Sequence, residues 1–262
     1  METTPAIDVD HLVARYDERT ILNDVSFQVR RGERFVIVGG SGCGKTTLLR
    51  HLIGLQRPSA GRVLLDGEDI GQANEDDLRR IQRKFGMLFQ AGALFGSLTL
   101  GQNVALPLEE YTTLPQETID ILVRIKLSMV KLDGFTEFAI AALSGGMKKR
   151  AALARAMALD PSILFFDEPS AGLDPITSAE LDELILQINK SLGTTIVVVS
   201  HELSSIFTIA ERVIMLDSRT KSIIAEGDPK QLRDHSTDPR VHAFFNRQPD
   251  PQFHARRAPS GH

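Results

Sequence analysis

Cysteine is nearly absent from this sequence, and neither an excess of positive charge nor a long apolar run is present. Cys43 is the only cysteine, so no internal disulfide can form, which favours a reducing compartment. Acidic residues exceed basic ones, 34 to 30, so charge gives no reason to expect nucleic acid as a partner. The longest apolar stretches, such as 195–199, fall far short of the roughly 18 residues of a membrane-spanning helix. Met1–Asp10 also lack the basic and apolar regions of a secretory signal, so we expect neither a signal peptide nor a membrane span.

The sequence does contain short apolar runs that alternate with amphipathic segments. We expect helices from Lys45 to about Gly54, at 76–84 and at 178–191. From about Ala91 to about Ala158 we expect only helices joined by short breaks. This order predicts a mostly parallel α/β core that carries a helical subdomain. The expected strands are at residues 7–13, 21–29, 34–38, 61–66, 85–89, 163–166, 195–200, 213–217 and 222–226.

A glycine-rich segment, Gly39-Gly40-Ser41-Gly42-Cys43-Gly44-Lys45-Thr46, fits the pattern G-x-x-x-x-G-K-S/T. It follows an expected strand and opens an expected helix, which is the context that a phosphate-binding loop requires. Glycines let backbone N–H groups turn inward around phosphate oxygens, and the helix N-terminus adds positive potential. Lys45 is expected to reach the β- and γ-phosphates of ATP, Thr46 to ligate Mg²⁺, and Thr47 to contact the nucleotide.

Two carboxylates end the apolar strand expected at 163–166. Asp167 and Glu168 would lie at the carboxyl edge of a parallel sheet, near the phosphate loop. We expect Asp167 to hold Mg²⁺ and Glu168 to polarise the attacking water as general base. In a sequence without a phosphate loop, the same pattern would indicate an ordinary strand that ends in a solvated acidic turn.

Cys43 has two interpretations. A thiol at a helix N-terminus beside Lys45 can have a lowered pKa and act as a redox sensor. The plainer interpretation is that a small side chain fits in the loop, and we favour this one.

The segment Leu143-Ser144-Gly145-Gly146-Met147 resembles the LSGGQ signature of ATP-binding cassette (ABC) ATPases. The resemblance covers residues 6–235 and implies a P-loop (RecA-like) α/β core with an N-terminal antiparallel β subdomain and an inserted α-helical subdomain at about 91–158. It implies ATP and Mg²⁺ as ligands. It also implies a head-to-tail pair, in which Ser144, Gly145 and Gly146 of one copy close over the ATP of the other.

Four further residues match elements of that family. Tyr16 matches the aromatic residue that stacks on adenine, and Gln90 matches the glutamine that senses Mg²⁺ and the attacking water. Asp174 matches the aspartate that communicates across the dimer, and His201 matches the histidine that contacts the γ-phosphate. Met147 departs from the usual signature glutamine, which leaves one signature contact open, and Glu202 stands where aspartate is common.

Two segments look most like the ATPases of Mla/Mce-type phospholipid transporters, namely Gln90–Leu100 and Asn103–Leu108. The resemblance implies a peripheral protein on the cytoplasmic face of a bacterial inner membrane. It also implies a membrane permease, an Mce-domain lipid-binding protein and, through them, phospholipid as partners. Two alternatives remain: an importer ATPase for amino acids or another solute, and a soluble ABC protein that acts outside transport.

Two structural expectations complete the interpretation. We expect the nucleotide-binding domain to span residues 1–245 and residues 246–262 to be an extended or disordered tail that could instead wrap a neighbouring subunit. We also expect Phe95 and its apolar neighbours to line a groove for a helix of the membrane partner, or else only to pack the helical subdomain.

Overall fold

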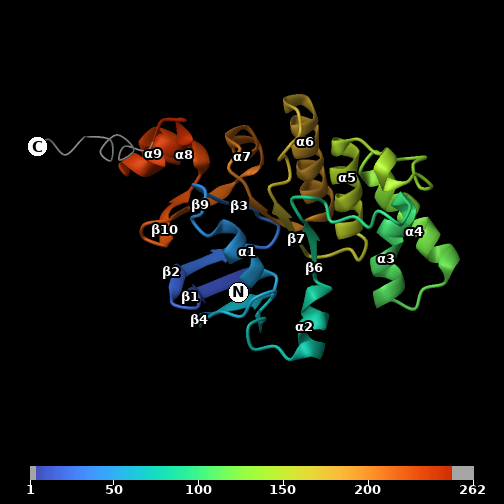
Figure 1. Cartoon of the computed structure of the whole chain (residues 1–262), viewed down its shortest axis with the longest axis horizontal. Coiled ribbons are helices and arrows are strands. Elements are labelled where there is room, and N and C mark those ends of the chain that lie inside the picture. Colours follow the sequence, from blue (N-terminus) through green and yellow to red (C-terminus); the bar gives the residue numbers. More distant parts are fainter. Residues whose placement is uncertain (1–3, 250–262) are drawn as a thin grey trace, which may run out of the picture.

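Two β-sheets and their flanking helices form the molecule, whose computed structural model describes residues 4–249 (Figure 1). The first sheet is antiparallel, with the order β2-β1-β4-β5. Its long strands alternate between buried and exposed positions, as expected for a sheet that covers a core with one face only. The strands are β1 (Ile7–Tyr16), β2 (Arg19–Val29), β4 (Ala60–Leu65) and β5 (Glu68–Asp69).

The second sheet has the order β10-β9-β3-β8-β7-β6. Its strands are parallel except β10, which runs antiparallel to β9. Strand β8 is buried along its whole length, as the continuous apolar runs of the sequence predict for a sheet covered on both faces. The strands are β3 (Arg34–Gly39), β6 (Phe85–Leu88), β7 (Ile163–Asp167), β8 (Thr195–Val199), β9 (Arg212–Asp217) and β10 (Ser222–Gly227).

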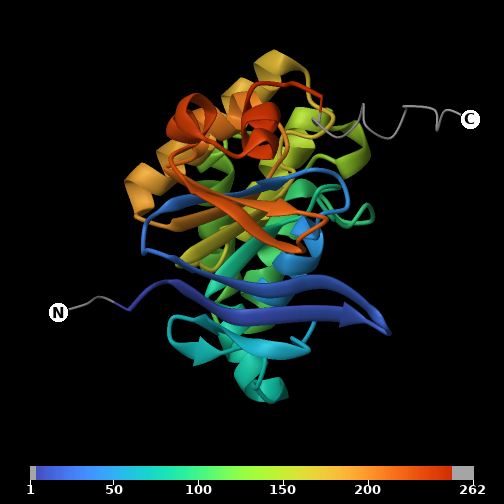
Figure 2. The same ribbon diagram turned by 90° about the vertical axis from the view of Figure 1, so that its left-hand side faces the viewer.

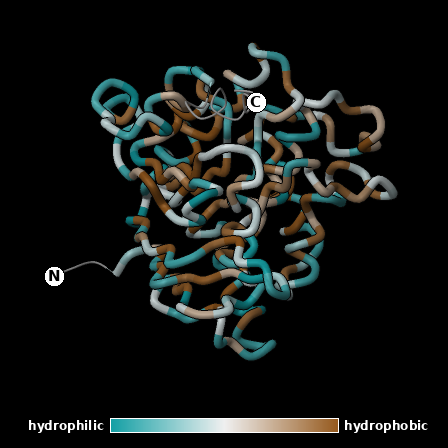
Figure 3. The backbone as a smooth tube through the Cα atoms, turned by 60° about the vertical axis from the view of Figure 1, so that its left-hand side comes forward, coloured by the Kyte–Doolittle hydropathy of each residue, from teal (hydrophilic) through white to brown (hydrophobic). Residues whose placement is uncertain are grey.

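The parallel sheet separates two apolar cores because successive side chains of a strand point to opposite faces. Phe35 and Ile37 face a core shared with the antiparallel sheet and helix α1 (Lys45–Leu52). Val36 and Val38 face a second core shared with the helices of the segment between β6 and β7 and with those that follow β7. Figure 2 shows the antiparallel sheet below the parallel sheet, with the C-terminal helices on the opposite side. Hydrophobic stretches run through the centre of the molecule, and hydrophilic ones lie at the outer turns (Figure 3).

The segment between β6 and β7 is helical, and within the described part of the chain it contributes no strand apart from a single bridge between Thr99 and Ala139. Helix α3 begins with a capping box, in which the Thr99 hydroxyl accepts from the Gln102 N–H and the Gln102 side chain accepts from the Thr99 N–H. Helices α3, α4 and α5 pack on one another at one end of the molecule (Figure 1). They are α3 (Leu100–Tyr111), α4 (Gln116–Met129) and α5 (Gly145–Ala156).

The other helices are α2 (Glu75–Gln82), α6 (Pro175–Leu192), α7 (Leu203–Ile209), α8 (Pro229–His235) and α9 (Pro239–Phe245), with a 3-10 turn at Ile140–Ala142. Among residues 4–249, no helix combines the length and the apolar character that a membrane crossing needs. The sequence did not lead us to expect α7, α8 or α9. Helix α9 ends where the predicted tail begins, and of that tail residues 250–262 lie outside the described residues, so the tail remains a prediction.

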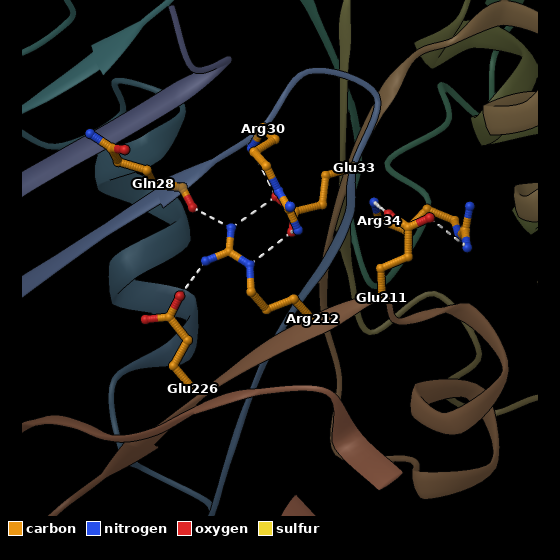
Figure 4. A network of polar contacts seen from close by, with 7 residues as sticks. All are labelled: Gln28, Arg30, Glu33, Arg34, Glu211, Arg212 and Glu226. Atoms are coloured by element: carbon orange, nitrogen blue, oxygen red, sulfur yellow. Dashed lines mark hydrogen bonds and ion pairs between the residues drawn. The ribbon is translucent and has the colours of Figure 1, made fainter. Parts of the chain in front are cut away.

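A buried ion pair joins the two sheets (Figure 4). Arg212, at the start of β9, donates from Nε and one Nη to the two oxygens of Glu33, both at 2.8 Å. The Glu33 residue is 3% exposed. Arg212 also donates to the main-chain oxygen of Gln28 in β2 at 2.6 Å and pairs with Glu226 in β10. One guanidinium therefore ties the antiparallel sheet to the edge of the parallel sheet.

Candidate active site

The loop between β3 and α1 has the backbone of a phosphate cradle. Gly39, Gly42 and Gly44 have φ values of 145°, 72° and 103°, which side chains other than glycine rarely adopt. A Cβ atom on Gly39 would lie 2.4 Å from the main-chain oxygen of Leu216, whereas one on Gly42 would meet nothing within 4 Å. The loop is therefore packed against the core on one side and open on the other, as a backbone that receives a ligand must be.

Lys45 is the first residue of α1 and turns back over this loop. Its Nζ donates to the main-chain oxygens of Gly39 at 2.8 Å and Gly40 at 3.1 Å. The helix has no acidic residue in its first turn and no side-chain cap, so its N-terminal N–H groups and the ammonium together make a positive site.

A cavity of about 750 Å³ opens over the loop. It brings together residues that are distant in the sequence, from β2, the phosphate loop, the segments that follow β6, β7 and β8, and helix α9. Its volume is that of a cleft for a ligand of cofactor size. The predicted residues that line it are Gly39, Gly40, Ser41, Gly42, Gly44, Lys45, Thr46, Thr47, Gln90, Glu168 and His201.

Glu168 and His201 face each other in this cavity. The Glu168 Oε1 and His201 Nδ1 atoms are 2.7 Å apart. Glu168 has a φ of 48°, in the left-handed region, and its N–H donates to Val199 O at 2.9 Å. The strained turn directs the carboxylate out of the sheet, where 13% of the side chain is exposed, while 68% of the His201 side chain is exposed.

Asp167 ends β7 beside the cavity without being one of its lining residues. Burial raises its pKa, and the neighbouring Glu168 raises it further, while Arg50, Lys45 and Lys149 act in the opposite direction. Two carboxylates at the end of one buried strand favour a bound cation. No cluster of three or more His, Cys, Asp or Glu side chains suited to a metal occurs within residues 4–249. Thr46, Gln90 and Asp167 offer oxygen donors of the kind that Mg²⁺ prefers, and their role as its ligands stays a prediction.

The signature residues lie apart from this cavity. Ser144 caps α5, where its hydroxyl accepts from the Met147 N–H at 3.2 Å. A Cβ on Gly146 would lie 2.5 Å from the methyl group of Thr177, so the signature packs against the start of α6. Asp174 caps that helix and accepts from the N–H groups of Ile176 and Thr177, both at 3.1 Å. None of Ser144, Gly145, Gly146 and Asp174 lines the chain's own nucleotide cavity.

Tyr16 and Cys43 also lie outside the lining. Tyr16 pairs with Arg19, which does line the cavity, and its hydroxyl donates to Gln56 Oε1 at 2.6 Å. Its adenine-stacking role stays a prediction. Cys43 is 2% exposed, and burial raises the pKa of its thiol despite the opposing charge of Lys45. A protonated, buried thiol favours the plain packing interpretation over a redox sensor.

Sequence reasoning missed four contributors to the site, two of which are the cavity-lining residues Arg19 and Ile21 of β2. Phe244, in the unpredicted helix α9, lines the cavity beside His201. Lys149, on the signature helix, is 7% exposed and donates to the main-chain oxygens of Gln90 at 2.5 Å and Glu168 at 3.4 Å. Its signal in the sequence was a lysine within the buried stripe of α5, where Ala151, Ala152 and Leu153 follow.

Comparison with known proteins places this site in a family. A family model described as ABC transporter matches residues 22–171. The intermembrane phospholipid transport system ATP-binding protein MlaF of Haemophilus influenzae is 40% identical, over 93% of this chain and 91% of that protein. A probable ribonucleotide transport ATP-binding protein, mkl of Mycobacterium leprae, is 41% identical, over 92% of this chain and 69% of that protein.

A solved structure supports the same assignment at the level of the fold. It is described as a dimeric post-hydrolysis state of an ATP-binding cassette, bound to ADP and phosphate. Its sequence is 30% identical, the TM-score is 0.77, and the match covers 85% of this chain and 98% of that one. The parallel core with an antiparallel sheet is thus the cassette fold that the sequence predicted. The chain belongs to the ABC transporter family, as an ATP-binding protein that hydrolyses ATP.

Proposed function

We propose that this chain powers phospholipid transport between the inner and outer membranes of a bacterial envelope. The observation that carries the ATPase part is the single cavity shared by Lys45, Thr46, Gln90, Glu168 and His201. The phospholipid part rests on the relative from Haemophilus influenzae, which aligns along almost its whole length and is named for phospholipid transport.

Nucleotide binding follows from the loop. Adenine stacks on Tyr16, and the phosphates lie over Gly39–Thr46, where open space and N–H groups face the cavity. Thr46, Gln90 and Asp167 would hold Mg²⁺, which would offset the negative charge of the phosphates. The contacts of Lys45 with its own loop oxygens exchange for contacts with the β- and γ-phosphates.

Hydrolysis uses the pair at the end of β7 and after β8. Glu168 accepts a proton from the attacking water, and the 2.7 Å contact with His201 orients its carboxylate. His201 and Lys45 stabilise negative charge that develops on the phosphoryl oxygens. Release of phosphate removes contacts that hold the closed state, so the protein reopens.

A second copy of the chain completes the site. Ser144, Gly145 and Gly146 lie away from their own cavity, so they are free to close on the γ-phosphate bound by the partner in a head-to-tail pair. Asp174, which holds the start of α6 against that signature, relays closure from one site to the other. A solved dimer of a related cassette supports this arrangement.

The remaining partners are those of a membrane transporter. We place the chain on the cytoplasmic face of the inner membrane, bound to a permease and, with it, to an Mce-domain lipid-binding protein; nucleic acid is not a partner. The second candidate is import of a solute. The relative from Mycobacterium leprae favours it, because its name assigns ribonucleotide transport at a similar identity.

Affinity purification of the tagged full chain from native membranes in mild detergent separates these candidates. Mass spectrometry of proteins and lipids in the eluate should find a permease, an Mce-domain protein and enriched phospholipid. A permease with a periplasmic solute-binding protein, and no lipid enrichment over a Lys45→Ala control, would overturn the phospholipid assignment and leave the ATPase intact.

A further inference from the structure

Three buried polar side chains meet behind the Glu168–His201 pair. Ser170 follows β7, Asp182 lies on α6, and Ser205 lies on α7; they are 2%, 3% and 2% exposed. Helices α6 and α7 lie side by side above the parallel sheet (Figure 1). An acidic side chain is rarely buried this deeply without a charged partner, so Asp182 requires an explanation.

The contacts of this cluster run through Ser205. The Ser205 hydroxyl lies 3.5 Å from the Ser170 hydroxyl, and it is the hydrogen-bonding group that lowers the pKa of the Asp182 carboxyl. The second carboxyl oxygen, Asp182 Oδ1, is buried and has no hydrogen-bond partner within residues 4–249. Burying a carboxylate in this way lowers the stability of the fold, because the charge loses its water and a single hydroxyl does not replace that hydration.

The cluster connects the two halves of the hydrolytic pair. Ser170 lies two residues after Glu168, and Ser205 lies four residues after His201. Helix α7 spans only Leu203–Ile209, and no side chain caps its N-terminus. A helix that short depends on tertiary contacts for its position, and the Ser205 contacts are the polar ones that reach both α6 and the loop after Glu168.

We propose that Asp182 is a positioning residue for ATP hydrolysis, which acts through Ser205 and Ser170 to hold His201 against Glu168. This inference rests on the proposed roles of Glu168 and His201 in hydrolysis. Asp182 does not line the nucleotide cavity, so its loss should change the rate of the chemical step while nucleotide binding stays intact.

The charge state of Asp182 gives the proposal a distinctive readout. Burial raises the pKa of Asp182 to about 6, the hydrogen bond of Ser205 lowers it, and the negative charge of Glu202, at the start of α7, raises it. Below this pH the carboxyl is protonated and can donate to Ser205. Above it the carboxylate only accepts, so Ser205 must turn its proton toward α6 and away from Ser170. The turnover rate should therefore change with pH near 6.

Four full-length proteins test the proposal: wild type, Asp182→Asn, Asp182→Val and the matched control Glu183→Gln, which alters an exposed carboxylate on the same helix. Steady-state phosphate release would be measured from pH 5 to 8, with thermal melting as the check on folding. We expect Asp182→Val to lower kcat about 10- to 100-fold with KM unchanged, which is the cost of a misplaced catalytic pair. Asp182→Asn keeps a hydrogen-bonding group and should retain most of kcat but lose the inflection near pH 6.

A wild-type kcat in Asp182→Val, or an inflection near pH 6 that persists in Asp182→Asn, would overturn the proposal. If Asp182→Val fails to fold, Ser205→Ala takes its place and should show the same loss of kcat at constant KM. Glu168→Gln is assayed in parallel: wild-type hydrolysis in that variant would reject the proposed function itself, whereas an inactive Glu168→Gln beside an unaffected Asp182→Val rejects only the role of Asp182.

Discussion

The Nδ1 atom of His201 lies 2.7 Å from the Oε1 atom of Glu168. These residues come from adjacent strands of the parallel sheet, since β7 and β8 pair with Asp167 opposite Val199. The carboxyl ends of parallel strands thus bring the proposed base and its proposed orienting partner to the same edge, beside the phosphate loop.

Lys45 should govern nucleotide affinity. Replacing Lys45 by Ala removes the ammonium that we propose contacts the β- and γ-phosphates, and a charged hydrogen bond contributes about 1.5–3 kcal/mol. We expect ATP to bind about 10- to 100-fold more weakly, measured by titration with a fluorescent ATP analogue. Lys190→Ala, an exposed lysine near the end of α6, is the control. An unchanged affinity in Lys45→Ala would place the phosphates elsewhere.

The Arg212–Glu33 pair should govern stability and its pH dependence. Replacing Arg212 by Met leaves Glu33 buried without its main partner, and breaking such a pair costs about 3–5 kcal/mol. Urea unfolding of Arg212→Met and of the exposed control Arg62→Met measures the difference. A loss below about 1 kcal/mol would mean that the pair offsets only its own desolvation.

The pKa of Glu33 sets the sign of the pH effect. Burial alone would raise this pKa, but hydrogen bonds from Arg212 and Arg30 outweigh it, so the pKa falls below its usual value of 4.5. The wild type gains this stability above the unfolded pKa and loses it as the pH falls through the folded one. Arg212→Met should therefore lose less stability than the wild type on acidification from pH 5 to 3.

Cys43 should resist modification in the folded protein. It is 2% exposed, and burial raises the pKa of its thiol, so little thiolate meets the solvent at pH 8. Because Cys43 is the only cysteine, the release of thionitrobenzoate from Ellman's reagent reports on it alone. We expect a reaction at least about 100-fold slower in the native than in the urea-unfolded chain. A native rate close to the unfolded one would revive the redox interpretation.

Phe95 should link the ATPase to its membrane partner. The residue is 51% exposed, while its main-chain N–H and C=O are both hydrogen-bonded to the buried Asn103 side chain. An exposed ring on an anchored loop suits a docking contact. Phe95→Asp should keep the basal ATPase rate but lose co-purification of the permease, whereas Leu192→Asp, at an exposed position at the end of α6, should lose neither. A permease that binds Phe95→Asp normally would remove Phe95 from the interface.

The sequence predicted most of the sheet because a parallel strand buried on both faces leaves a continuous apolar run. The segments 163–166 and 195–200 were recognised in this way, and the structure ends them within one residue. The phosphate loop and the acidic edge were predictable for a related reason. Each is formed by residues that are adjacent in the sequence, so a local pattern of glycines or carboxylates indicates it.

Helices α8 and α9 were missed although each has a local signal. Asp228-Pro229 and Asp238-Pro239 are N-caps followed by proline at the first helical position, and both aspartates accept main-chain N–H bonds in the structure. The helices are short and contain little apolar periodicity, so the hydrophobic pattern does not indicate them. As a consequence, the sequence did not predict that Phe244 of α9 lines the nucleotide cavity.

Other features depend on contacts between distant segments, which a single sequence does not reveal. A Cβ atom on Gly86 would lie 2.0 Å from the main-chain oxygen of Ala156, so this glycine lets strand β6 approach the signature helix. The cluster of Asp182, Ser205 and Ser170 likewise forms only when α6 and α7 pack together. Asp182 has the sequence context of an exposed helix residue, and only the fold buries it.

The most direct test of the central claim is phosphate release by the Glu168→Gln variant at saturating ATP and Mg²⁺. A general base contributes about 10²- to 10⁴-fold, so we expect kcat to fall by that factor. ATP should still bind and trap the closed pair, visible as a dimer by size-exclusion chromatography, and Glu183→Gln, which alters an exposed carboxylate on α6, should behave as wild type. Turnover at the wild-type rate in Glu168→Gln would contradict the account.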